Sequence, residues 1–85
     1  MAKSVFTDEY RVLTEELTAA RRAAGLSQQE VAERLERPQS YIAKVEGGQR
    51  RLDLVEFLEL TAAIHTDPHK IIAAIQSLSR RRRRG

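Results

Sequence analysis

The chain has 85 residues, enough for one small domain but not for two. Its net charge is +3, but Arg80–Arg84 supplies five positive charges, so the other residues hold 10 basic and 12 acidic side chains. The body of the chain is therefore not basic overall, and any case for nucleic-acid binding depends on where the charges lie. The chain has no cysteine, which excludes disulfides, thiolate metal sites and a thiol nucleophile and fits a reducing cytoplasm. We expect no signal peptide, because acids occur where its apolar segment should be, and no apolar run reaches membrane-spanning length.

Apolar residues recur at three- and four-residue spacing and period-two alternation is absent, which predicts an all-α fold. The first helix is expected over about 8–24, with Thr7 as its N-cap and Gly25 at its end. Its apolar stripe consists of Tyr10, Leu13, Leu17, Ala20 and Ala24.

The second helix has a strong start signal in "LSQQEV". Ser27 is the expected N-cap, and Glu30 three residues later completes a capping box. Leu26 and Val31 stand where a hydrophobic staple needs them. The helix is expected to run to about Leu35.

A third helix is expected over about 39–46, ended by Gly47 and Gly48. Pro38 is expected in its first turn, because its missing N–H has no helical partner there. Only residues 36–38 separate this helix from the second, which predicts a steep crossing of the two.

The fourth helix opens with "LDLVEF". Asp53 is its expected N-cap, Glu56 closes a second capping box, and Leu52 with Phe57 forms a second staple. Its buried positions are expected among Leu54, Leu58, Leu60, Ala62 and Ile64.

The fifth helix is expected to begin with Asp67 as its cap and Pro68 at its first position. Its apolar residues are Ile71, Ile72, Ile75 and Leu78. Isoleucines so closely spaced indicate that some of these apolar side chains stay exposed on the surface of the domain. We interpret that exposed surface as a homodimer contact. The alternative, that all three isoleucines are core, stays open.

Helical signals fade after Leu78. We therefore divide the chain into an N-terminal arm (1–7), one domain (8–78) and an arginine-rich tail (79–85). We expect a run such as Arg80–Arg84 to make a supplementary contact with DNA phosphates. The alternative, that the run is solvated and has no role, stays open.

Two short helices joined by a tight turn form the helix-turn-helix unit. The stretch "LSQQEVAERLERPQSYIAKVEGGQRRL" resembles the phage-repressor and Cro-like family of bacterial regulators, also called the xenobiotic-response-element (XRE) family. The resemblance covers about residues 17–72. It implies a five-helix domain that binds palindromic double-stranded DNA as a dimer, inserts its third helix into the major groove and regulates transcription, with repression as the expected effect.

The same resemblance implies roles for individual residues. It assigns base reading to Gln39, Ser40 and Lys44, and a phosphate contact to Gln28. It also implies a structural ion pair between Arg21 and Glu46. Glu36 and His65 depart from the family, which usually has Gly at both positions, and Glu36 is expected to adopt a left-handed conformation at some cost.

The residues support this reading independently. Ser40 and Lys44 lie opposite the apolar Ile42 and Val45 on the third helix. Gln, Ser and Lys can all bond base edges, although polar residues on a helix face are usually only solvated. The further candidates for phosphate contacts are Arg37, Tyr41, Gln49, Arg50 and Arg51.

Other classes of function are weaker. His65 and His69 have a possible metal-ligand spacing, but no acid cluster completes a site, so we expect no metal or cofactor. We also expect no enzyme, because no strand-borne nucleophile turn exists. The main rival is an antitoxin-like or adaptor protein whose principal role is binding a protein partner.

Overall fold

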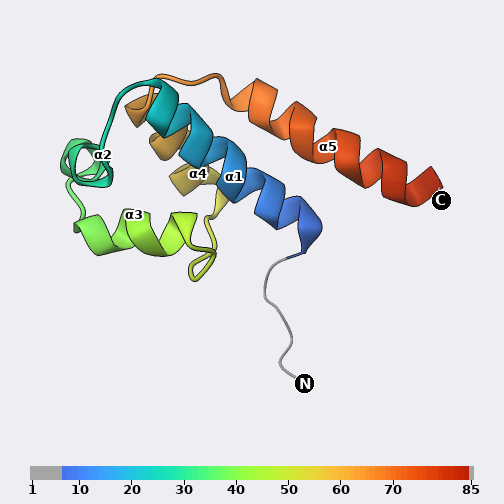
Figure 1. The fold of residues 1–85 in the computed structure, drawn as a ribbon, viewed down its shortest axis with the longest axis horizontal. Coiled ribbons are helices and arrows are strands. Elements are labelled where there is room, and N and C mark those ends of the chain that lie inside the picture. The colour runs from blue at the N-terminus through green and yellow to red at the C-terminus, as the bar shows by residue number, and fades with distance from the viewer. Residues whose placement is uncertain (1–6, 85) are drawn as a thin grey trace.

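The computed structural model describes the backbone of residues 7–84 and the side chains of residues 7–81 (Figure 1). Within that range it contains five helices and no strand, which confirms the predicted all-α fold. The helices are α1 (Asp8–Ala23), α2 (Gln28–Leu35), α3 (Gln39–Glu46), α4 (Leu54–Ala63) and α5 (Pro68–Arg84). None of them is long and apolar enough to cross a bilayer. The predicted N-terminal arm, apart from Thr7, lies outside the described residues.

Three helices begin with the side-chain caps that the sequence predicts. The Thr7 hydroxyl accepts a hydrogen bond from the first turn of α1. Ser27 with Glu30 and Asp53 with Glu56 form complete capping boxes at the starts of α2 and α4. These caps satisfy backbone N–H groups that have no partner inside the helix, and so they define where each helix begins.

The starts of α3 and α5 differ from each other. Pro38 is the N-cap of α3, with φ −65° and ψ 150°, and not a residue of its first turn as predicted. A proline forms no side-chain cap there, so the start of α3 has no local side-chain hydrogen bond. At α5, Asp67 Oδ1 accepts a hydrogen bond from the His69 N–H at 2.9 Å, and Pro68 is the first helical residue.

The first four helices end in the same way. At each of these ends one residue adopts a left-handed backbone conformation, and its N–H donates to the carbonyl oxygen of the residue three positions earlier. The N–H of the following residue donates to the carbonyl oxygen of the residue five positions before it. The left-handed residues are Gly25, Glu36, Gly48 and His65. Glu36 and His65, with φ of 56° and 57°, do so without the freedom of glycine, as predicted for Glu36.

Tertiary packing places α1 between α3 and α5 (Figure 1). α2 packs on α3 and α4, and α5 packs mainly along α1. The core lies between these helices. Its buried apolar residues are Tyr10, Leu13, Leu17, Val31, Ala32, Tyr41, Ile42, Val45, Phe57, Leu60, Ile64 and Ile71.

α4 buries two of the five positions that the sequence offers as candidates. Leu60 and Ile64 are buried, but Leu54, Leu58 and Ala62 are exposed. The sequence did not decide among the five candidates because α4 is apolar on nearly all sides, so the spacing of its apolar residues does not identify one face.

α5 also differs from the prediction in two respects, the burial of Ile71 and the length of the helix after Leu78. Ile71 is buried within the domain, which excludes it from the predicted dimer contact, while Ile72, Ile75 and Leu78 are partly buried. The helix does not fade after Leu78 but continues to Arg84, past the N-terminus of α1 (Figure 1). Arginine is a good helix former, and positive charge is favourable near a helix C-terminus.

The left-handed residue at the end of α2 gives a stability prediction. Glu36→Gly should raise the free energy of unfolding by about 0.5–1 kcal/mol, because glycine adopts this conformation without the steric cost of a Cβ. Urea denaturation of the variant and the unchanged chain measures the difference. Glu33→Gly, within the right-handed part of α2, is the matched control and should lower the free energy of unfolding by about 1 kcal/mol. A loss of stability for both variants would contradict the prediction.

Candidate nucleic-acid interface

α3 presents one face to the core and the opposite face to solvent. Ile42 and Val45 are almost completely buried. Ser40 and Lys44, four residues apart, are exposed on the other side, and Gln39 is exposed at the first turn. With about 100° between successive residues, Gln39 and Glu46 lie on one flank of this face and Tyr41 on the other. The helix therefore has an outward polar surface between two flanks.

The Glu46 flank of α3 is held by an ion pair. Arg21 donates from Nε to Oε2 of Glu46 at 2.7 Å and from Nη2 to Oε1 at 3.1 Å. Its Nη1 donates to the carbonyl oxygen of Leu26 at 2.7 Å. Both charged side chains are only 10% exposed. The expected Arg21–Glu46 pair thus joins α1, the turn after it and the end of α3.

Gln28 extends this network to the start of α3. Its Nε2 donates to Oε1 of Glu46 at 3.0 Å, and its Oε1 accepts from Nε2 of Gln39 at 2.7 Å. The expected phosphate contact and one expected base reader are therefore hydrogen-bonded to each other. The amide nitrogen of each glutamine carries a second N–H that is able to donate to another acceptor.

The Tyr41 flank carries a charged cluster. The guanidinium carbons of Arg37 and Arg50 lie 4.4 and 4.8 Å from the centre of the Tyr41 ring, within the range of cation–π contact. Burial of the phenol raises the pKa of Tyr41, so its hydroxyl stays a hydrogen-bond donor. Arg50 also pairs with Glu56 through Nη1–Oε1 (3.1 Å) and Nη2–Oε2 (2.8 Å). Arg37 lies 3.9 Å from the carboxylates of both Glu56 and Glu59.

The loop after α3 is anchored on α1. The Tyr10 hydroxyl accepts a hydrogen bond from the Leu52 N–H at 2.7 Å and donates to the Arg50 carbonyl oxygen at 3.5 Å. The Arg51 guanidinium lies over the Tyr10 ring, with its carbon 4.5 Å from the centre. Gln49 is exposed in the same loop. The candidate phosphate contacts 49–51 are thus carried by a loop whose path is fixed by hydrogen bonds.

Comparison with known proteins supports a single family. A family profile described as "Helix-turn-helix domain" matches residues 12–71. An XRE-family like protein from Pseudomonas syringae pv. tomato str. DC3000 has a similar structure, with a TM-score of 0.79 and 41% identity over 84% of this chain and 87% of that one. The chain belongs to the XRE-like helix-turn-helix family.

A second solved structure agrees with this assignment. The restriction-modification controller protein C.AhdI from Aeromonas hydrophila is 32% identical, with a TM-score of 0.69 over 76% of this chain and 98% of that one. No match was found among curated proteins. The domain is therefore a helix-turn-helix DNA-binding domain, and its XRE-like relatives belong to a family of regulators rather than enzymes.

Sequence reasoning missed the roles of two residues in this XRE-like domain. Tyr10 was assigned only to the apolar stripe of α1, and Glu56 only to a capping box. Glu56 performs both functions, because its Oε1 accepts from the Asp53 N–H at 3.0 Å while the carboxylate pairs with Arg50. These two interactions hold the pKa of Glu56 at about 2, with the hydrogen bonds from Arg50 as the larger cause. No local spacing signals this pairing, since Arg50 precedes α4 and Glu56 lies within it.

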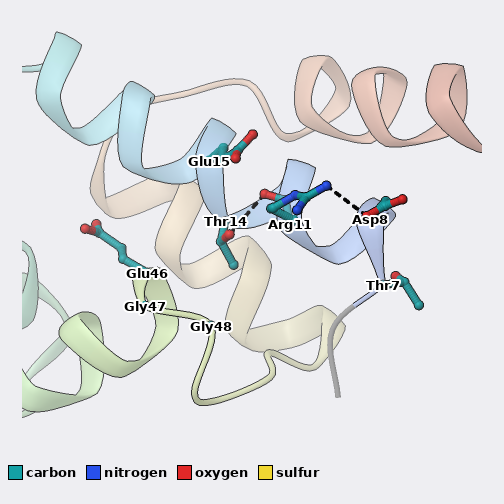
Figure 2. A pocket seen from close by; sticks show the side chains of 8 residues that line it. All are labelled: Thr7, Asp8, Arg11, Thr14, Glu15, Glu46, Gly47 and Gly48. Carbon is teal, nitrogen blue, oxygen red and sulfur yellow. Dashed lines mark hydrogen bonds and ion pairs between the residues drawn. The ribbon is translucent and has the colours of Figure 1, made fainter. Parts of the chain in front are cut away.

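A hollow of about 360 Å³ separates the start of α1 from the end of α3 (Figure 2). It is lined by Thr7, Asp8, Arg11, Thr14, Glu15, Glu46, Gly47 and Gly48. Arg11 pairs with Asp8 at 2.8 Å on one wall, and the Glu46 carboxylate points away from that pair (Figure 2). Among the residues that the structure describes, no group of three or more His, Cys, Asp or Glu is placed to hold a metal ion.

The network behind α3 gives a second stability prediction. Glu46→Ala should lower the free energy of unfolding by about 3–5 kcal/mol, because it leaves the buried Arg21 guanidinium without its anion. Arg11→Ala is the control, since it breaks the exposed Arg11–Asp8 pair and should cost less than about 1 kcal/mol. Urea denaturation measures both. Equal small losses would show that the Arg21–Glu46 pair does not hold α3.

Proposed function

We propose that the chain is a sequence-specific transcriptional regulator that binds a palindromic operator as a homodimer and represses by occupying a promoter. α3 enters the major groove, where Gln39, Ser40 and Lys44 bond base edges. The observation that carries this proposal is the outward polar face of α3, which is held in position by the Arg21–Glu46 pair. The similar protein from Aeromonas hydrophila is a restriction-modification controller, which supports a role in gene regulation.

Phosphate contacts on both flanks orient α3 in the groove. Gln28, at the first position of α2, contacts the backbone on the Glu46 flank, where the helix N-terminus also favours an anion. Arg37, Tyr41 and Arg50 supply the contacts on the other flank, and Gln49 and Arg51 supply further contacts from the loop after α3. Such contacts set the register of the helix, and the base contacts then provide specificity. The supplementary contact of Arg80–Arg84 with DNA stays a prediction. These residues belong to α5, and α1 lies between α5 and α3 (Figure 1).

Lys44→Ala tests the assignment of base reading. Selection of binding sites from random duplexes should yield a palindromic consensus whose half-sites lie about 34–36 Å apart or a multiple of that distance. On the selected duplex, Lys44→Ala should weaken binding by about 1–3 kcal/mol and relax the preference at one base position. Fluorescence anisotropy titration measures the affinity.

Lys70→Ala is the matched control, because Lys70 is an exposed lysine on α5. It makes the same change of charge and should leave specific binding within a factor of about two. If both variants bound the selected duplex as tightly as the unchanged chain, Lys44 would not be a base contact. If no sequence were enriched, the proposed function itself would fail.

The dimer contact that we propose lies mainly on α4. Leu54, Val55 and Leu58 are 67%, 64% and 44% exposed, and they are the exposed large apolar residues of the described chain. A hollow of about 200 Å³ next to them is lined in part by Ile72 and Ile75 of α5. These residues form one apolar surface, and a second copy that covers it would also add buried area to a domain of only 85 residues.

Val55→Glu tests this contact. A carboxylate at the centre of an apolar interface has no partner there, so the variant should be monomeric in analytical ultracentrifugation and bind the palindromic duplex more weakly. Ala19→Glu, which adds the same charge at an exposed position of α1, should remain dimeric. A dimer that survives Val55→Glu would place the interface elsewhere.

The same apolar surface supports the alternative function, an antitoxin-like or adaptor protein that binds a protein partner. The two proposals differ in what Lys44→Ala should do, since Val55→Glu reduces function under both. If a partner is primary, Lys44→Ala spares function in the cell, whereas Val55→Glu abolishes it.

A further inference from the structure

Glu56 stands where two guanidinium groups converge on the Tyr41 flank of α3. Its Oε2 accepts from Nη2 of Arg50 at 2.8 Å and lies 3.9 Å from Nη1 of Arg37. Both guanidinium groups also lie on the ring of Tyr41. The carboxylate therefore occupies the position of an anion shared by two cations, each of which is a candidate phosphate contact.

The two arginines remain accessible although they are paired. The side chains of Arg37 and Arg50 are 36% and 38% exposed, whereas that of Glu56 is 15% exposed. A guanidinium group binds carboxylate and phosphate with the same forked geometry, so the two anions compete for the same N–H groups. The pKa of Glu56, at about 2, keeps this internal anion charged at neutral pH.

We propose that Glu56 is an internal anion that competes with DNA phosphates for Arg37 and Arg50 and so limits sequence-independent affinity. The inference rests on the proposed DNA-binding function and concerns its regulation. Sequence-independent binding depends almost entirely on cations that neutralise phosphates, so an internal carboxylate weakens it directly. The base contacts of α3 involve other residues. The competition therefore acts on the phosphate contacts and leaves the base reading by α3 unchanged.

Glu56→Gln tests the proposal without removing the helix cap. Glutamine keeps the Oε1 that accepts from the Asp53 N–H, and Glu and Gln both serve in a capping box. The variant should bind a random-sequence duplex about five- to tenfold more tightly at 0.1 M salt for each additional phosphate that the two arginines neutralise. A plot of log K against log salt concentration should become steeper by about 0.9 for each such phosphate.

Matched variants separate this effect from a general change of charge. Glu16→Gln changes the charge by the same amount at an exposed position of α1. It should leave the affinity for the random-sequence duplex and the slope of the salt plot nearly unchanged. Glu59→Gln should have a smaller effect than Glu56→Gln, because Glu59 lies 3.9 Å from Arg37 and forms no hydrogen bond with Arg50. Adding Arg50→Gln to Glu56→Gln should remove most of the increase in affinity. Affinity of Glu56→Gln equal to or weaker than that of the unchanged chain would overturn the proposal.

Elution from immobilised heparin tests the same competition with a polyanion that has no bases. Glu56→Gln should elute at higher salt than Glu16→Gln. If it did so while no variant bound any duplex, the anion competition would be supported and the proposed DNA-binding function would fail. Equal elution of the two variants would overturn the competition even if the unchanged chain bound its operator.

Discussion

Glu46 accepts hydrogen bonds from Arg21 and Gln28, and the position of α3 depends on these bonds. α3 spans only Gln39–Glu46 and has no side-chain cap at its start, so it is too short to be stable by itself. Its apolar face anchors it in the core, but burial alone does not fix the rotation or direction of a helix. The directional bonds to Glu46 supply that constraint at one end, and the Gln28–Gln39 bond supplies it at the other.

This arrangement uses a buried charge pair for orientation rather than for stability. A buried ion pair is often no more stabilising than apolar residues of the same volume, although breaking it by removing one partner is costly. Here the pair connects α1 to the end of α3, and Arg21 also bonds the carbonyl of Leu26 in the turn before α2. One guanidinium group therefore fixes how α1, the turn after it and the end of α3 meet. The outward face of α3, with Ser40 and Lys44, is presented in one orientation as a result.

The charged side chains on the Tyr41 flank of α3 are paired in a different way. The chain outside Arg80–Arg84 contains more acidic than basic residues, and the two cations on the Tyr41 flank are paired with acids of α4. These cations are held beside the outward face of α3 and yet are partly neutralised. Under the proposed competition, this pairing limits the attraction to any polyanion and leaves discrimination to the short polar face of α3.

Local chemistry in the sequence determined most of the helices. Ser27 with Glu30, Asp53 with Glu56, and the glycines after α1 and α3 act over a few residues, so they fix helix ends in any tertiary context. The outward positions of Ser40 and Lys44 followed from helical spacing in the same way. Their proposed contact with bases came from the family resemblance and is a separate question.

Tertiary structure decided what depends on residues far apart in the chain. α4 is apolar on nearly every side, so only packing against α2 and α5 determined that Leu60 and Ile64 would be buried and Leu54 and Leu58 exposed. The role of Glu56 beside Arg37 and Arg50 likewise required the turn after α2 and the loop after α3 to meet at the first turn of α4. A capping box and a helix period are short-range properties that a sequence displays directly. The side of an apolar helix that meets its neighbours, and the cation that a carboxylate meets, are set by the free energy of the whole packed domain.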